Sequence, residues 1–144
     1  MNENEKNVLD ELCKGACMGK DAIAFTLEKV NDKALKEELT KQYQDYDSVY
    51  KKIKKIYPDY SDDSPHETST MNKVMTWYGI EIRLLVDESS SKIAELILQG
   101  TNMGIIEGRR LLNNNPSVDK SVRQILDDFV VMQEDSVETL KKYL

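Results

Sequence analysis

Proline and glycine are scarce in this chain, which has only three prolines and six glycines among its 144 residues. Strict alternation of valine or isoleucine with polar residues is the pattern of a half-buried strand, and it is rare in this sequence. Few helix breakers and no period-two pattern together argue against a β-sheet. The sequence therefore predicts an all-α protein.

Long apolar runs and a secretion signal are also lacking. No stretch reaches the ~18 consecutive apolar residues typical of a membrane-spanning helix. The opening residues, MNENEKN, are polar and acidic and do not resemble a signal peptide. Two cysteines without such a signal are typical of a reducing compartment. We therefore expect a cytoplasmic protein without membrane association.

Positive charge is in the minority, since 20 basic residues stand against 26 acidic ones and the net charge is −6. Nucleic-acid binding requires a basic face to meet the phosphates. The one lysine cluster, at residues 51–55, lies at the end of a predicted helix, where cations complement the helix dipole. We therefore expect no nucleic-acid partner.

Apolar residues recur at the helical spacing of about 3.6 residues along most of the chain. The length fits a single domain, residues 1–144. The pattern predicts four long helices and an additional helix in the connection between the second and the third, where Ser64 and Pro65 form a helix start. The predicted bounds are residues 3–30, 32–57, 65–87, 90–112 and 116–143.

The lengths of the connections predict how the helices are ordered in space. Short links make one hairpin of the first two helices and another of the last two. The long connection spans ~30 Å if it is helical, which returns the chain to the end where it started. The second and third helices then run parallel. The prediction is an up-down-down-up four-helix bundle with one long crossover.

Glycines stand at four-residue spacing inside the first and third predicted helices, so those of each helix share a face. The pattern Gly-x-x-Met-Gly occurs once in each of these helices, which indicates an internal repeat of two hairpins. Bare backbone lets a second helix approach closely. We predict that the first and third helices pack backbone to backbone at Gly15, Gly19, Gly100, Gly104 and Gly108.

The predicted helix over residues 65–87 has a second apolar seam beside its inner face, formed by Trp77, Ile80 and Leu84. Apolar patches of this kind often mark interfaces when they are exposed. Two interpretations stay open, a homodimer contact and burial within the bundle. His66, the only histidine, is expected at the surface on the first turn of this helix.

The duplicated hairpins, the one long crossover and the lengths of the helices resemble the ferritin-like superfamily, in particular small bacterial ferritin-like domains of unknown function. The resemblance implies two metal ions, held by a glutamate on each of the first and third helices and by Glu-x-x-His on each of the second and fourth. Here Gln133 and Ser136 stand in place of Glu-x-x-His on the fourth helix, and Tyr46 stands at the matching position of the second. Glu107 is the only interior carboxylate candidate.

The candidate site residues are therefore Glu107, Gln133, Ser136 and Tyr46, as one interior polar cluster. One carboxylate, an amide and a hydroxyl cannot neutralise two divalent cations. Three interpretations stay open: a hydrogen-bonded network that fixes helix register, a weak ligand site, and exposure of Glu107 to solvent. A further alternative is a small molecule bound at Tyr46 and Gln133, in a cavity between the second and fourth helices.

Cys13 and Cys17 lie one turn apart on the first predicted helix. Such a pair can bind a soft metal or react with oxidants, but no third thiol or histidine lies nearby in the sequence. Cysteines in helices more often fill small apolar spaces. We favour the packing interpretation.

Two functional hypotheses follow from these patterns. The first is a non-enzymatic ferritin-like bundle with a structural or interaction role, without a metal or cofactor, with an unidentified protein partner or a second copy of itself. The alternative is a metal-binding ferritin-like protein with an altered site, linked to iron or oxidative stress. The incomplete ligand set favours the first hypothesis.

Overall fold

The computed structural model describes residues 3–65 and 89–144, and over these residues the chain is helical without strands. Four long helices are present, as predicted, together with the short 3-10 turn η1. Their bounds are α1 (Glu3–Leu27), α2 (Lys33–Ile56), η1 (Tyr57–Asp59), α4 (Ser90–Asn114) and α5 (Lys120–Lys141). Among the helices described, none is long and apolar enough to cross a membrane.

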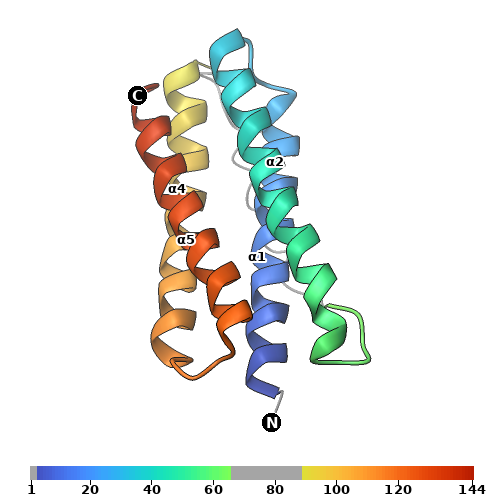
Figure 1. Cartoon of the computed structure of the whole chain (residues 1–144). Coiled ribbons are helices and arrows are strands. Elements are labelled where there is room, and N and C mark those ends of the chain that lie inside the picture. The colour runs from blue at the N-terminus through green and yellow to red at the C-terminus, as the bar shows by residue number, and fades with distance from the viewer. Residues whose placement is uncertain (1–2, 66–88) are drawn as a thin grey trace.

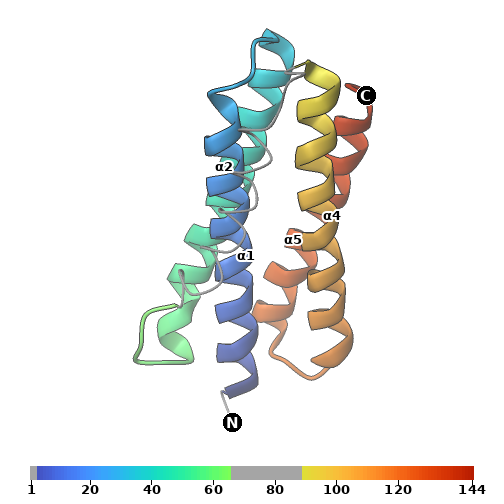
Figure 2. The ribbon, with the colours of Figure 1, turned by 180° about the vertical axis from the view of Figure 1, so that it is seen from behind.

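The four helices pack side by side as two antiparallel hairpins, α1 with α2 and α4 with α5 (Figure 1). The two views show that α2 and α4 run in the same direction, from the end of the molecule that holds the C-terminus toward the opposite end (Figure 2). The helix predicted over residues 65–87, with His66 and the seam of Trp77, Ile80 and Leu84, falls outside the described residues apart from its first position.

Side-chain caps fix where two of the helices begin. The Asp32 carboxylate accepts a hydrogen bond from the backbone N–H of Leu35 at 3.0 Å, and Ser89 accepts one from the N–H of Lys92 at 3.3 Å. Both residues satisfy a backbone donor that has no partner within the helix. The Leu35 N–H also holds the pKa of the Asp32 carboxyl below its usual value.

The core consists of the inner stripes of all four helices, which meet along the length of the molecule. The apolar residues of each stripe follow the helical spacing that the sequence predicts. The largest fully buried aliphatic side chains come from every helix: Leu9, Leu12, Ile23, Leu35, Leu39, Ile53, Ile93, Leu126 and Leu140. This packing positions the polar residues near mid-helix.

Two buried carboxylates join the start of α1 to its neighbours. Asp10 accepts a hydrogen bond from the Tyr57 hydroxyl at 2.8 Å and one from Lys6 Nζ at 3.0 Å. Glu5 accepts one from the backbone N–H of Asp119, just before α5, at 3.3 Å. Both carboxylates are buried, so these bonds replace the water that they lose. The contacts tie the N-terminal end of α1 to the end of α2 and to the start of α5.

Candidate functional site

Near the middle of each glycine-bearing helix, a side chain of the hairpin partner packs against a glycine. A Cβ atom placed on Gly19 of α1 would lie 2.5 Å from the ring of Tyr46 on α2. A Cβ on Gly104 of α4 would collide with the side-chain amide of Gln133 on α5. Gly19 and Gly104 are the matching glycines of the two Gly-x-x-Met-Gly patterns. The two hairpins therefore use their glycines in the same way.

The predicted backbone contact between the glycine stripes of α1 and α4 is corrected by this arrangement. For the four glycines other than Gly100, the atoms nearest to an added Cβ belong to side chains of α2 and α5, including Phe129 at 3.2 Å from Gly15 and Val130 at 2.6 Å from Gly108. The glycine spacing indicates that another group packs closely against the helix backbone, and that group can be a large side chain as well as a second backbone. Gly100 and the other four glycines instead line a pocket between the two helices.

Tyr46 and Gln133 meet in the interior, where each side chain is only 3% exposed. Gln133 Nε2 donates a hydrogen bond to the Tyr46 hydroxyl oxygen at 3.3 Å. The Tyr46 ring contacts Phe129 edge to face, with ring centroids 6.0 Å apart. Burial raises the pKa of the Tyr46 phenol, so the group is neutral at pH 7. The mid-bundle pair is therefore uncharged.

Thr101 of α4 completes this neutral group. Its hydroxyl donates to the carbonyl oxygen of Ile97 at 2.8 Å, and its oxygen interacts with the Tyr46 hydroxyl. The sequence analysis did not single out Thr101. Its position four residues after the inward-facing Ile97 is the signal that could have found it.

A pocket of about 490 Å³ lies between α1 and α4, with Tyr46 and Gln133 in its lining. This volume is within the range of small-molecule sites. The cavity expected for a bound molecule was between the second and fourth helices, whereas this pocket is on the side of the Tyr46–Gln133 pair that faces α1 and α4. Its other lining residues include Leu12, Met18, Ala22, Ile23, Ile97, Met103, Leu111 and Phe129.

Glu107 is not an interior residue, which corrects its place in the predicted cluster. Its side chain is 68% exposed and accepts a hydrogen bond from Arg110 at 2.8 Å. It lies on the rim of the pocket, one turn from Gly104 and next to the buried Gly108. Arg110, three residues further along the helix, favours this outward position, and so does the greater stability of a charge in water than in the core.

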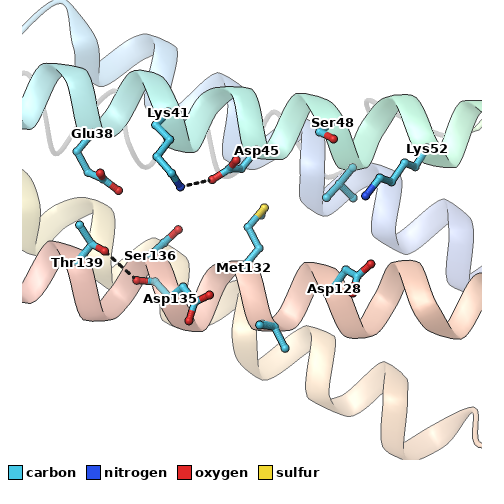
Figure 3. Close-up of a pocket in the computed structure, with 12 residues that line it drawn as sticks. Glu38, Lys41, Asp45, Ser48, Lys52, Asp128, Met132, Asp135, Ser136 and Thr139 are labelled. Carbon is cyan, nitrogen blue, oxygen red and sulfur yellow. Dashed lines mark hydrogen bonds and ion pairs between the residues drawn. The ribbon is translucent and has the colours of Figure 1, made fainter.

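Ser136 is buried as predicted, but it lines a second groove of about 350 Å³ between α2 and α5. Figure 3 shows that charged side chains of both signs occupy this groove. Lys41 Nζ donates to Asp45 at 2.9 Å, and this bond raises the pKa of Lys41. Exposed ion pairs of this kind contribute little energy. The groove resembles a solvated surface more than a binding site, so the pocket between α1 and α4 is the better candidate.

The described residues contain no group of three or more His, Cys, Asp or Glu side chains placed to hold a metal ion. Cys13 and Cys17 are both buried in the α1 face of the core, in agreement with the packing interpretation. Asp10 and Glu5 are buried carboxylates that the sequence analysis missed, and the Lys6–Asp10 spacing of four residues was the available signal for Asp10.

The chain matches no protein-family model, no curated protein and no solved structure. Its function is therefore argued from the geometry of the pocket and of the mid-bundle residues.

Proposed function

We propose that this protein is a non-enzymatic helical bundle of ferritin-like shape, with a structural or interaction role and without a centre of two metal ions. One observation carries the proposal. The side chains that meet at mid-helix are a phenol and an amide, joined by the hydrogen bond from Gln133 to Tyr46. These are neutral groups at the place where a ferritin-like protein would concentrate carboxylates.

The directions of the helices support the ferritin-like shape. The chain leaves η1 at one end of the molecule and enters α4 at the other, so α2 and α4 are parallel (Figures 1 and 2). A long connection between the second and third helices of a bundle is the feature that separates ferritin-like folds from simple up-and-down bundles.

The chemistry of the mid-bundle groups supports the absence of a metal pair. Two divalent cations bring four positive charges, and proteins bind them with several anionic oxygen ligands. Tyr46, Gln133 and Thr101 supply no negative charge, because burial keeps the Tyr46 phenol protonated. Cations placed there would lose their water without gaining compensating charge.

The alternative, an altered metal site linked to iron or oxidative stress, depended on Glu107 as an interior ligand. That carboxylate is at the surface and is paired with Arg110. The buried carboxylates, Asp10 and Glu5, are near the start of α1 and bind Tyr57, Lys6 and the Asp119 backbone. Within residues 3–65 and 89–144, this alternative therefore has no anionic ligand beside Tyr46 and Gln133.

Metal analysis tests the proposal. The protein is purified from medium supplemented with iron and manganese, and the metal content per chain is measured after gel filtration. We expect well below one metal ion per chain. Glu107→Gln and Gln133→Leu serve as matched variants. One or two ions per chain in the wild type, lost in either variant, would contradict the proposal, because both substitutions remove oxygen donors beside the pocket.

The interaction role includes a proposed homodimer through Trp77, Ile80 and Leu84. Sedimentation of the wild type beside Trp77→Glu tests it, with a dimer expected for the first and a monomer for the second. Monomers in both samples would remove the homodimer and leave the interaction role to a different protein.

A further inference from the structure

Gln133 has a hydrogen-bonding atom without a partner. Its Oε1 atom is buried and accepts no hydrogen bond from the residues that the structure describes, although the residue lines the pocket between α1 and α4. Buried polar atoms are almost always hydrogen-bonded, because leaving one unsatisfied is unfavourable. A molecule bound in the pocket that Gln133 lines would supply the missing hydrogen-bond donor.

One hydrogen bond fixes which end of the amide lacks a partner. Gln133 Nε2 donates it to the Tyr46 hydroxyl oxygen, so the carbonyl oxygen is the end of the amide that is left over. The unpartnered atom is therefore the carbonyl oxygen, and the missing partner must be a donor.

The glycines keep the pocket open above this acceptor. With a Cβ at position 19 or 104, the Tyr46 ring or the Gln133 amide would have to move away from the helix backbone, where each now sits. Glycine within a helix is unfavourable relative to alanine. Of the described residues, the side chains seated against Gly19 and Gly104 leave the pocket between α1 and α4 open.

The pocket walls define the class of molecule that fits. They are mainly aliphatic, aromatic and bare backbone, with Tyr46, Thr101 and Gln133 as the buried polar residues. The charged residues of the lining are at the rim, where Lys14 pairs with Glu11 at 3.1 Å and Glu107 pairs with Arg110. A charged molecule would find no opposite charge inside, whereas an apolar one would bury its surface.

We propose that the pocket between α1 and α4 binds a neutral, mainly apolar small molecule that carries one hydroxyl or N–H, and that this group donates a hydrogen bond to Gln133 Oε1. The bundle would then be a small-molecule-binding protein, a function independent of whether the structural or interaction role holds.

Two probes that differ by one methyl group, which replaces the donor hydrogen, test this site at pH 7. 2-Naphthol carries a hydroxyl, and 2-methoxynaphthalene carries a methyl ether in its place. Binding is followed by the methyl NMR signals of methionines. We expect 2-naphthol to bind about tenfold more tightly, as one hydrogen bond to a buried acceptor implies. The signals of Met18 and Met103, which line the pocket, should shift, while that of Met132 in the α2–α5 groove should not.

Two variants test whether the preference for 2-naphthol depends on the Gln133 amide. Gln133→Leu removes the acceptor while keeping a similar volume, and it should bring the two probes to equal affinity. Gln42→Leu is the matched control, because Gln42 is 1% exposed, also has an unpartnered Oε1 and does not line the pocket. It should leave the preference unchanged. A thermal unfolding curve for each variant confirms that it is folded.

Several results would overturn the proposal. Wild-type protein that binds neither probe indicates that the pocket holds water only. Equal binding of the two probes by the wild type shows that Oε1 receives no donor, and this comparison needs no variant. A preference that survives in Gln133→Leu shows that the methyl group, and not the acceptor, decides the selectivity.

Discussion

The hydroxyl of Tyr57 donates to the carboxylate of Asp10 at 2.8 Å, and both side chains are buried. Tyr57 directly follows α2, and Asp10 lies in α1, so the bond joins the ends of the first hairpin. Lys6 binds the other oxygen of the same carboxylate. The buried Asp10–Tyr57 bond, with the half-buried Lys6 beside it, holds the two helices in register.

Removing the Tyr57 hydroxyl should destabilise the fold measurably. Tyr57→Phe leaves Asp10 with one donor fewer in a buried place, and we expect the free energy of unfolding in urea to fall by about 1–3 kcal/mol. Tyr60→Phe is the matched control, since its hydroxyl is 3.0 Å from Ser121 Oγ at an exposed position. The control substitution should lower the free energy of unfolding by less than about 0.5 kcal/mol. Equal losses in the two variants would show that burial of the bond does not matter.

Stability should decline in alkali because of Tyr46 and Tyr57. Burial raises the pKa of both phenols in the folded state, and the bond to Asp10 adds to the shift at Tyr57. The unfolded chain releases these protons near pH 10, so above that pH the folded state binds more protons than the unfolded state. The contribution is therefore complete below about pH 10 and is lost as the pH rises further.

Urea unfolding from pH 8 to 11 measures this decline. Tyr46→Phe removes one of the two phenols, so the variant should lose less stability than the wild type over the same pH interval. An identical pH dependence in the two proteins would mean that the Tyr46 phenol ionises as readily in the folded as in the unfolded chain.

The two glycines of the first Gly-x-x-Met-Gly pattern should respond differently to alanine. At Gly19 the added Cβ would lie 2.5 Å from the Tyr46 ring, which cannot move without repacking. We expect Gly19→Ala to destabilise by about 1–2 kcal/mol, because the steric cost exceeds the gain in helix propensity. At Gly15 the nearest atom would be 3.2 Å away, on Phe129, so Gly15→Ala should be close to neutral.

Thermal or urea unfolding of the two alanine variants provides the comparison. If Gly19→Ala were as stable as Gly15→Ala, the Tyr46 ring would not be seated against the α1 backbone. Adding Tyr46→Leu to Gly19→Ala should recover part of the loss, since it removes the ring that the Cβ meets.

The helices and the inward direction of Tyr46 and Gln133 could be predicted from the sequence because apolar periodicity reports which face of a helix is buried. The partners of the glycines could not. Four-residue spacing shows that something approaches the backbone, but a tyrosine ring, an amide and a second backbone all fit that pattern.

Apolar periodicity also could not predict where the carboxylates lie. Glu107 is adjacent to the buried Gly108, so its helical position alone allows either an inward or an outward side chain. The outward position keeps the charge in water, beside Arg110. Asp10 is interior because Tyr57, distant in sequence, supplies a donor. A partner so distant in the sequence cannot be predicted from the local spacing of residues.

Crystallography with anomalous scattering tests the central claim most directly. Crystals are grown from protein prepared with iron and manganese, and data are collected at both absorption edges. The account predicts no metal peak at mid-bundle, with the Gln133 amide within hydrogen-bond distance of the Tyr46 hydroxyl. A pair of metal peaks between the helices, bound by carboxylates, would contradict it.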